Sequence, residues 1–409
     1  MRFHVVGAGI AGLAAALDAA DAGHDVQLYE AAPQAGGRCR SLDDRMLGRR
    51  IDNGSHVLIG ANPHALGYLD RIGARGTLVH LGASGLPFAD LQSGDAWIFR
   101  PGNLVPGVGL VRHLRALALV PPAGQRTVTG LLGRGPMVRR LWSPLTVAAL
   151  NTAPDEASAQ LLRRVAWEIA CRGRSGLDLM MAAEGLSETF VDPALEQLRN
   201  AGATIRFSAR LGALEFAGGG VAALIFGTER IALDRCDRIV LAVGPQAAKG
   251  LIPDLSVPVG SNAVVNGHFL VEPAIVPNGS VPIMGICGAT AHWLFQRGDV
   301  LSATASAANV LAAEDSETIA RRLWHDIARA LGLRRTALPP YRVVKEKRAT
   351  FAQTPANEAR RPGPDSGLAN LALAGDWTAT GLPASIECAV FSGRRAFAHA
   401  RDLRRAQSG

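Results

Sequence analysis

A short glycine-rich turn near the start of the chain restricts the fold more than any other feature. Residues 2–6 (RFHVV) read as a buried strand, residues 7–12 (GAGIAG) as a tight turn, and the following LAAALDAADAG as a helix that ends at Gly23. A second strand follows at residues 25–30 (DVQLYE). The order strand, glycine turn, helix, strand predicts a βαβ unit, and therefore an α/β fold with a parallel sheet.

The residues of this unit each have an expected task in binding a dinucleotide. Gly7 permits the turn, Gly9 lets the backbone approach a pyrophosphate, and Gly12 lets the helix pack closely on the strand. The helix N-terminus around Ala11 offers free N–H groups to phosphate. Glu30 ends the second strand 18 residues after Gly12, where a carboxylate can accept hydrogen bonds from ribose hydroxyls.

A second glycine cluster follows the second strand and indicates which dinucleotide is bound. Gly36, Gly37, Arg38 and Ser41 resemble the G-G-R-x-x-S signature of the amine oxidase and phytoene desaturase superfamily of flavoproteins. The resemblance implies FAD as the cofactor, with this cluster at its pyrophosphate, where a guanidinium can bind phosphate oxygens in a fork. A solvated surface charge is the alternative for Arg38.

The far end of the chain carries a matching motif. Residues 368–400 read as an apolar strand, a turn at Gly375-Asp376 and a helix that begins near Ser385. In the same superfamily this turn binds the ribityl chain or pyrophosphate, and Ser385 and Ile386 would begin a helix whose positive end faces the pyrimidine edge of the flavin. Two FAD motifs more than 300 residues apart imply a cofactor domain assembled from both chain ends.

The resemblance also implies how the chain is divided. A helix, a glycine and a strand at residues 193–216 fit a third piece of the cofactor domain, with the backbone near Leu211 at the adenine. We expect a Rossmann-like FAD-binding domain, a parallel sheet with flanking helices, plus an inserted α+β substrate domain with a mixed sheet. The expected ranges are 1–85, 186–250 and 341–409 for the FAD-binding domain, and 86–185 and 251–340 for the substrate-binding domain.

Composition argues against several other classes. The chain of 409 residues is 48% hydrophobic, 19% charged and 5% aromatic, which fits a two-domain globular protein and not a nucleic-acid binder that stacks bases. Its net charge of +8 is a weak signal over this length. The most apolar stretch, residues 103–122, is interrupted by Arg112, His113 and Arg115, so we expect no membrane span. Its amphipathic character leaves a peripheral contact with the inner face of the cytoplasmic membrane open.

The cysteines indicate the compartment. Their number is odd and no C-x-x-C pair occurs, which argues against a disulfide framework or structural zinc. We therefore expect reduced thiols in a cytoplasmic protein without a metal site. The cysteines are Cys39, Cys171, Cys236, Cys287 and Cys388.

Five segments narrow the resemblance to the hydroxysqualene dehydroxylases, which are squalene-associated flavoproteins of squalene and hopanoid biosynthesis. Two positions depart from the pattern: Ser55 replaces a longer amide residue before His56, and Cys388 replaces a glycine. Both lie near the expected flavin. The segments are residues 52–62 (DNGSHVLIGAN), 148–159, 185–190 (GLSETF), 343–363 and 373–387.

The resemblance implies a reaction that removes the allylic hydroxyl of hydroxysqualene with hydride from reduced flavin N5. This chemistry needs an acid for the leaving hydroxide, a dry apolar pocket and a nearby flavin. His56 would lie near both flavin and substrate as an acid or hydroxyl anchor, and Trp377 would flank the ring or substrate. Packing or backbone hydrogen bonding is the plainer alternative for each. An unidentified electron donor must recharge the flavin.

Three other functions remain open from sequence. A flavin amine oxidase would need an aromatic cage, whereas the position after the final turn is Ser385 and the chain has only three tyrosines. A phytoene-type desaturase or carotenoid isomerase shares the cofactor and the apolar substrate. A prenyl-lipid carrier of this fold would bind no flavin, against which Glu30 and the Gly36-Gly37-Arg38 cluster argue. The oligomeric state is not indicated.

Overall fold

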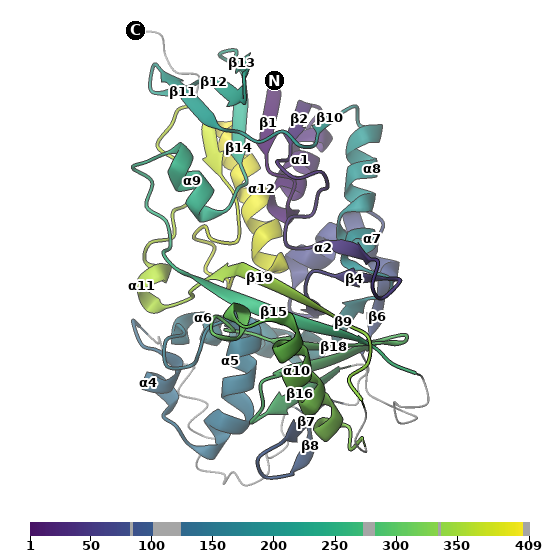
Figure 1. The fold of residues 1–409 in the computed structure, drawn as a ribbon. Coiled ribbons are helices and arrows are strands. Elements are labelled where there is room, and N and C mark those ends of the chain that lie inside the picture. Colours follow the sequence, from purple (N-terminus) through teal and green to yellow (C-terminus); the bar gives the residue numbers. More distant parts are fainter. Residues whose placement is uncertain (82–84, 101–123, 273–282, 334–336, 404–409) are drawn as a thin grey trace.

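The computed structural model describes the chain except for residues 82–84, 101–123, 273–282, 334–336 and 404–409. A five-stranded parallel sheet has the order β10-β2-β1-β14-β20 (Figure 1). This arrangement, 3-2-1-4-5 in chain order, is that of a doubly wound nucleotide-binding sheet. The strands are β1 (Arg2–Val6), β2 (Asp25–Tyr29), β10 (Thr204–Arg206), β14 (Arg238–Leu241) and β20 (Leu371–Leu373).

Both faces of this sheet are covered, which explains why β14 and β20 are almost entirely apolar and buried. On β14, Val240 packs with helices on one side, whereas Ile239 and Leu241 pack toward the other side. The helices are α1 (Ile10–Asp21), α2 (Pro63–Arg71), α7 (Leu186–Phe190), α8 (Asp192–Asn200) and α12 (Ile386–Asp402). The other side is covered by the antiparallel strands β11 (Ala213–Ala217), β12 (Gly220–Phe226) and β13 (Glu229–Ala232), with α9 (Pro245–Leu251) beyond them.

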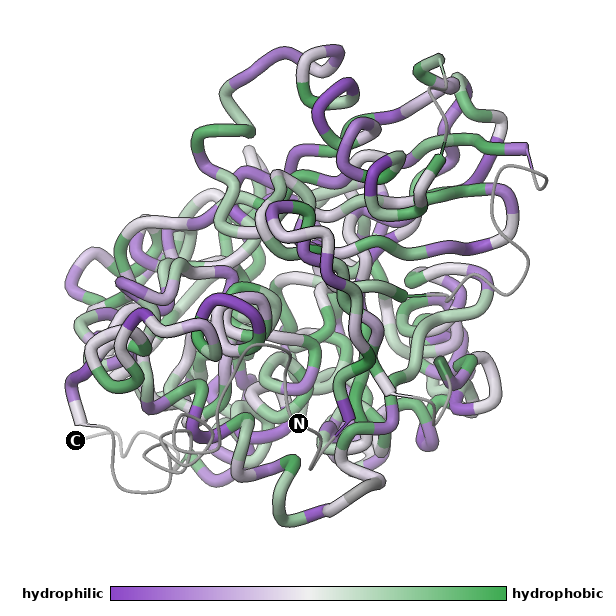
Figure 2. Tube along the Cα trace, turned by 90° about the horizontal axis from the view of Figure 1, so that it is seen from below, coloured by the Kyte–Doolittle hydropathy of each residue, from purple (hydrophilic) through white to green (hydrophobic). Residues whose placement is uncertain are grey.

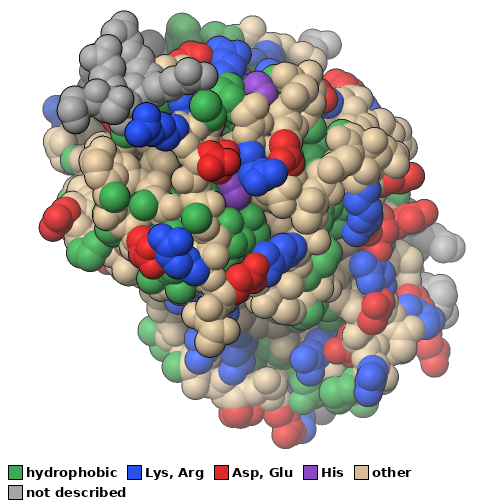
Figure 3. All heavy atoms as spheres, turned by 90° about the horizontal axis from the view of Figure 1, so that it is seen from above, with side chains coloured by type: hydrophobic (Ala, Val, Ile, Leu, Met, Phe, Trp, Pro, Cys, Tyr) green, Lys and Arg blue, Asp and Glu red, His purple; other side chains and the backbone are tan. Residues whose placement is uncertain are grey.

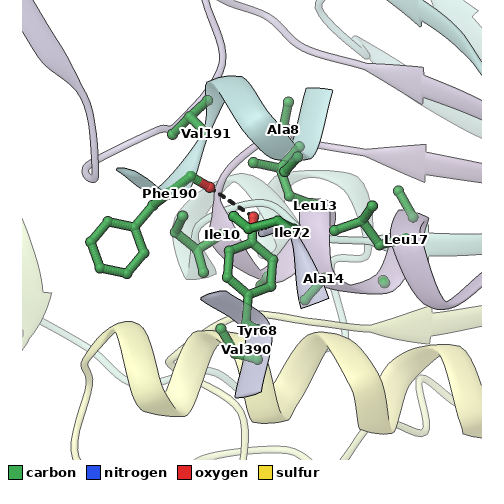
Figure 4. Close-up of a cluster of buried hydrophobic side chains, with 14 of the residues drawn as sticks. Ala8, Ile10, Leu13, Ala14, Leu17, Tyr68, Ile72, Phe190, Val191 and Val390 are labelled. Atoms are coloured by element: carbon green, nitrogen blue, oxygen red, sulfur yellow. Dashed lines mark hydrogen bonds between the residues drawn. The ribbon is translucent and has the colours of Figure 1, made fainter. Parts of the chain in front are cut away.

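The two ends of the chain meet where α12 packs on α1. A Cβ atom added at Gly393 on α12 would lie 2.1 Å from the backbone oxygen of Ala11 on α1, so only glycine allows this approach. Figure 4 shows side chains of α1 with Val390 of α12 and with Tyr68 of α2, whose hydroxyl donates a 2.8 Å hydrogen bond to the backbone oxygen of Phe190. The helical layer therefore contains residues from every part of the expected cofactor domain.

A seven-stranded mixed sheet forms the lower half of the molecule in Figure 1, with the order β19-β15-β18-β17-β16-β7-β8. Side chains alternate between the two faces of β15. Those of Ala263, Val265 and Phe269 lie on the face that packs with α10 (Ser316–Ala330). The strands are β7 (Leu86–Asp90), β8 (Ala96–Phe99), β15 (Ser261–Leu270), β16 (Ile283–Cys287), β17 (Trp293–Arg297), β18 (Val300–Ala305) and β19 (Tyr341–Phe351).

Short elements connect the two sheets. A hairpin joins β3 (Ser41–Asp44) to β4 (Arg49–Asp52), and a small sheet has the order β5-β9-β6, formed by Val57–Ile59, Leu179–Ala182 and Leu78–His80. Helices α4 (Val128–Leu132), α5 (Ser143–Leu150) and α6 (Ala159–Arg172) lie at the side of the mixed sheet in Figure 1, and α11 (Pro355–Glu358) follows β19.

The expected α/β fold class is confirmed, and the expected domain ranges stay a prediction. Two strands pair with segments of the other expected domain. β19, in the range 341–409, pairs with β15 in the mixed sheet, and β9, in the range 86–185, pairs with β5 and β6. Both strands are polar or short and carry no local signal of their partners.

The surface gives limited information about partners. No described helix is long and apolar enough to cross a membrane, and hydrophilic residues recur along the chain in Figure 2. The amphipathic stretch at residues 103–122 lies outside the described residues. On the face seen from above, acidic and basic side chains are interspersed (Figure 3). This face therefore has no single basic patch of the kind that binds nucleic acid.

Replacing Gly393 by alanine should destabilise the protein, because the added methyl group would force α12 away from α1. We expect a loss of about 1–3 kcal/mol in the free energy of unfolding. The matched control is Gly67→Ala on α2, where an added Cβ meets nothing within 4 Å and helix propensity predicts a gain of about 0.5–1 kcal/mol. Urea unfolding of both variants measures the difference, and equal stabilities would contradict the close packing.

Candidate active site

The turn between β1 and α1 has an open position where a phosphate group would fit. Gly7 has φ +105°, and a Cβ there would lie 2.4 Å from the backbone oxygen of Ala242. A Cβ on Gly12 would lie 1.8 Å from the oxygen of Gly7, whereas a Cβ on Gly9 would meet nothing within 4 Å. No side chain caps the first turn of α1, and Ala11 is buried toward α12. The turn therefore leaves backbone N–H groups beside free space at Gly9.

Glu30 lies next to this turn at the end of β2. Its carboxylate accepts 2.8 Å hydrogen bonds from the backbone N–H groups of Ala8 and Ala32. Each oxygen retains a lone pair, so a ribose hydroxyl can still donate to it. The backbone N–H of Ala209 donates to the carbonyl of Glu30, which brings the segment that leads to Leu211 alongside. The structure thus gathers the residues expected at the adenosine end.

Arg38 and Asp376 join the motifs at the two chain ends. The guanidinium of Arg38 donates a 2.7 Å hydrogen bond to the carboxylate of Asp376, and this carboxylate raises the arginine pKa further. The preceding glycines lie beside the first turn, because Gly36 forms a bridge with Gly9 and a Cβ on Gly37 would lie 3.4 Å from Gly9. The Arg38 side chain is 42% exposed although Asp376 is buried. It therefore retains donors for a phosphate.

The loop from Gly375 to α12 is held by an arginine that the sequence did not single out. Arg361 is buried and donates hydrogen bonds to the backbone oxygens of Asp376, Thr378 and Leu382. Its guanidinium also forms an ion pair with Glu358 at 2.8 Å. Only the double arginine in the quoted segment 343–363 could have drawn attention to it, because the backbone carbonyl groups that it binds on this loop leave no pattern in the sequence.

The start of α12 follows this loop. Ser385 caps the helix by accepting a hydrogen bond from the N–H of Cys388, and Ile386 is its first residue. Both oxygens of Glu387 accept hydrogen bonds from the first N–H groups of α2, those of His64 and Ala65. Burial raises the pKa of Glu387 to about 7. The helix that is expected to face the flavin is thereby fixed to the helix that follows the DNGSHVLIG segment.

His56 lines a small pocket between the mixed sheet and the short elements that connect the two sheets. Burial lowers the pKa of His56, while the nearby carboxylate of Asp52 acts in the opposite direction. The pocket has a cavity volume of about 30 Å³, and the turn that carries His56 adjoins the phosphate-binding segment because the side chain of Asn53 donates to the backbone oxygen of Arg38. The lining residues are Ile51, Asp52, Ser55, His56, Met181, Ala182, Leu186, His268, Phe295, Arg297, Val300 and Ser302.

The carboxylate of Asp52 is fully paired at the edge of this pocket. Arg297 on β17 donates to it at 2.7 Å, and it also accepts hydrogen bonds from the hydroxyl of Ser41 and the backbone N–H of Leu186. Ser41 exchanges two further hydrogen bonds with Ser187. The hydroxyl of Ser41 is therefore engaged between β4 and α7, and no observation directs it at the expected cofactor.

Trp377 lies in the hydrophobic core. Its side chain is 1% exposed, it packs with residues such as Leu373 and Phe351, and its indole N–H donates a 2.8 Å hydrogen bond to the backbone oxygen of Val243. It is absent from the lining of the pocket that contains His56. Packing accounts for all of these contacts, so the structure gives no support to a catalytic role for Trp377.

A comparison with known families decides the class of this site. A family model described as flavin containing amine oxidoreductase matches residues 10–94 and 132–399. The chain belongs to this family. Hydroxysqualene dehydroxylases of Sinorhizobium fredii and Rhodopseudomonas palustris are each 40% identical to it over 407 residues, covering 96% of this chain and of each relative. Cyclohexylamine oxidase from Brevibacterium oxydans has a TM-score of 0.75 over 98% of both chains at 18% identity, which shows the fold.

As a member of the flavin-containing amine oxidoreductase family, the protein is a flavin-dependent oxidoreductase. The βαβ turn, Glu30 and the Arg38–Asp376 pair fit a flavin attached to a second nucleotide. They offer a position for the pyrophosphate and, next to it, an acceptor for a ribose hydroxyl. The cofactor is therefore FAD. Within this site, sequence reasoning missed Arg361, Arg297 and His268. Arg361 lies in the segment 343–363 but was not singled out there, and Arg297 and His268 come from segments without a local motif.

Gly9→Ala tests the phosphate position without disturbing the fold. The backbone of Gly9 has φ −74° and the added methyl group meets no protein atom, so stability without FAD should be unchanged. FAD should bind roughly 5- to 150-fold more weakly, corresponding to about 1–3 kcal/mol of overpacking against the phosphate. Titration of FAD into the flavin-free protein measures this change. Wild-type affinity would show that the pyrophosphate lies elsewhere.

Proposed function

We propose that this enzyme removes the allylic hydroxyl of hydroxysqualene to give squalene, with FAD as its cofactor. The observation that supports this most is the similarity to hydroxysqualene dehydroxylases along 96% of the chain. Two positions, Ser55 and Cys388, depart from the expected pattern. The hydrogen bonds of Glu30 and the pair of Arg38 with Asp376 are nevertheless formed.

The reaction replaces a C–O bond by a C–H bond. Reduced FAD supplies the hydride for the new C–H bond, the hydroxyl leaves as water after gaining a proton, and the flavin ends oxidised. The chain must therefore bind a neutral alcohol, keep bulk water away from a developing allylic cation, and stabilise the departing oxygen. An external electron donor is needed to reduce the flavin again.

Glu30, Gly9, Arg38 and Asp376 would hold the nucleotide and ribityl parts of FAD, and the N-terminus of α12 would face the flavin ring. His56 would act as an anchor for the substrate hydroxyl. Because burial lowers its pKa, its imidazole is uncharged near neutral pH and is better suited to hydrogen bonding than to delivering a proton from a resident imidazolium.

The chemistry of the pocket supports an alcohol in preference to an amine. Its charged members, Asp52 and Arg297, already pair with each other, so a cationic ligand finds no free carboxylate there. The other lining residues are either uncharged and polar, as His56 and His268 are, or apolar, as Met181 and Phe295 are, which suits a hydroxyl group and the hydrocarbon next to it. The isoprenoid chain is far larger than this cavity and must extend beyond it. Contact with a membrane surface would give access to such a substrate.

The chemically reduced enzyme should be reoxidised by hydroxysqualene in the absence of oxygen, with squalene as the product. The return of oxidised flavin absorbance and product analysis measure this reaction together. A phytoene-type desaturase would instead be reduced by its hydrocarbon, so reduction of the oxidised enzyme by phytoene, with no effect of hydroxysqualene on the reduced form, would contradict the proposal.

His56→Ala should lower turnover without loss of flavin. Removing a buried hydrogen-bonding partner costs about 1–3 kcal/mol, or roughly 5- to 150-fold in rate if the interaction forms in the transition state. The FAD content and the rate of flavin reoxidation are compared with those of the wild type. Normal turnover with full FAD content would remove His56 from the reaction.

A further inference from the structure

The face of the mixed sheet opposite α10 is polar in its central strands. Asn262, Asn266 and His268 alternate along β15 with the apolar residues that pack on α10. Asn266 donates to the backbone oxygen of Asn53, in the turn that carries His56. This polar face therefore packs directly on the DNGSH segment of the flavin-binding half, an arrangement that the sequence did not predict.

His268 and Ser302 are partners across two adjacent strands of this face. They are opposite each other in the antiparallel register of β15 and β18, and Nδ1 of His268 lies 2.8 Å from Oγ of Ser302. Both line the pocket that contains His56. The imidazole is 2% exposed, so the strand pairing and the serine fix its orientation.

The second nitrogen of this imidazole is available to a ligand. Nε2 of His268 is buried without a hydrogen-bond partner among the described residues, and a buried polar atom in this state is costly unless something pairs with it. Burial lowers the pKa of His268 to about 4. The charge of Arg297 acts in the same direction, whereas the charges of Asp52 and Asp44 and an interaction of the ring with the backbone of Asp52 oppose it. The ring is therefore uncharged near neutral pH.

We infer that His268, oriented by Ser302, hydrogen-bonds the hydroxyl group of the substrate and makes this pocket selective for an alcohol over the corresponding hydrocarbon. This inference rests on the proposed dehydroxylation. A serine hydroxyl that donates to Nδ1 leaves the hydrogen on Nε2, where it can donate to the oxygen as the C–O bond breaks.

The size and charge of the pocket agree with this role. Its cavity volume of about 30 Å³ exceeds the roughly 10–15 Å³ that one water molecule needs, so it can hold a hydroxyl group or the water formed from it. Arg297 and Asp52 neutralise each other as an ion pair, so neither needs a charged ligand. His56, from the turn before β5, and His268, from β15, would contact the oxygen from two sides.

His268→Leu tests the inference with ligands that differ mainly by the hydroxyl. The holoenzyme with oxidised FAD cannot deliver hydride, so the binding of hydroxysqualene and of squalene can be measured as dissociation constants without turnover. We expect roughly 10- to 100-fold weaker binding of hydroxysqualene and unchanged binding of squalene. Ser302→Ala should weaken hydroxysqualene binding in the same selective way, and His268→Gln should restore part of the affinity.

His292→Leu is the matched control, because His292 is another histidine of this region whose pKa is lowered by burial but it does not line the pocket. It should leave the ratio of the two dissociation constants unchanged. If His268→Leu weakens both ligands equally, or neither, the inference is wrong even though the reduced wild-type enzyme forms squalene. If the reduced wild-type enzyme forms no squalene, the proposed function itself fails.

Discussion

The contact between α1 and α12 is the constraint on which the rest of the structure depends. Residues near opposite ends of the chain approach so closely that a backbone oxygen of Ala11 occupies the space of any side chain at Gly393. The ion pair of Arg38 with Asp376 also joins the beginning and the end of the chain, on the side where the ligand is expected. Because both contacts combine a start and an end, the dinucleotide position exists only when the whole chain has folded.

Uncharged polar groups characterise the pocket beside this position. Burial keeps His56 and His268 neutral, while the nearby charges of Asp52 and Arg297 are paired. Buried charges are stable only when paired, whereas a buried neutral imidazole can keep one nitrogen for a ligand. This distribution favours the recognition of a neutral oxygen-containing substrate in apolar surroundings, and it gives the enzyme a means of distinguishing substrate from product.

Much of the nucleotide-binding half could be predicted from the sequence. The strand, turn and helix at residues 2–23 have strong local signals, since the glycines answer steric demands within a few residues. Glu30 and Arg38 follow at fixed offsets from this turn. In contrast, β19 reads as a charged segment with no sign of its pairing with β15, and Arg361 holds the loop before α12 through backbone carbonyl groups. Contacts of this kind depend on long-range packing and leave no periodicity.

The sequence alone determined the fold class, the cofactor and the family, because backbone turns and phosphate contacts need particular residues at particular spacings. Only the tertiary structure decided the composition of the pocket. Trp377, adjacent to a motif, lies in the core, whereas His268 and Ser302, in strands without a motif, line the same pocket as His56. The physical reason is that strand register and the face on which a side chain lies are set by pairing between distant segments, and a shift of one residue would reverse every face.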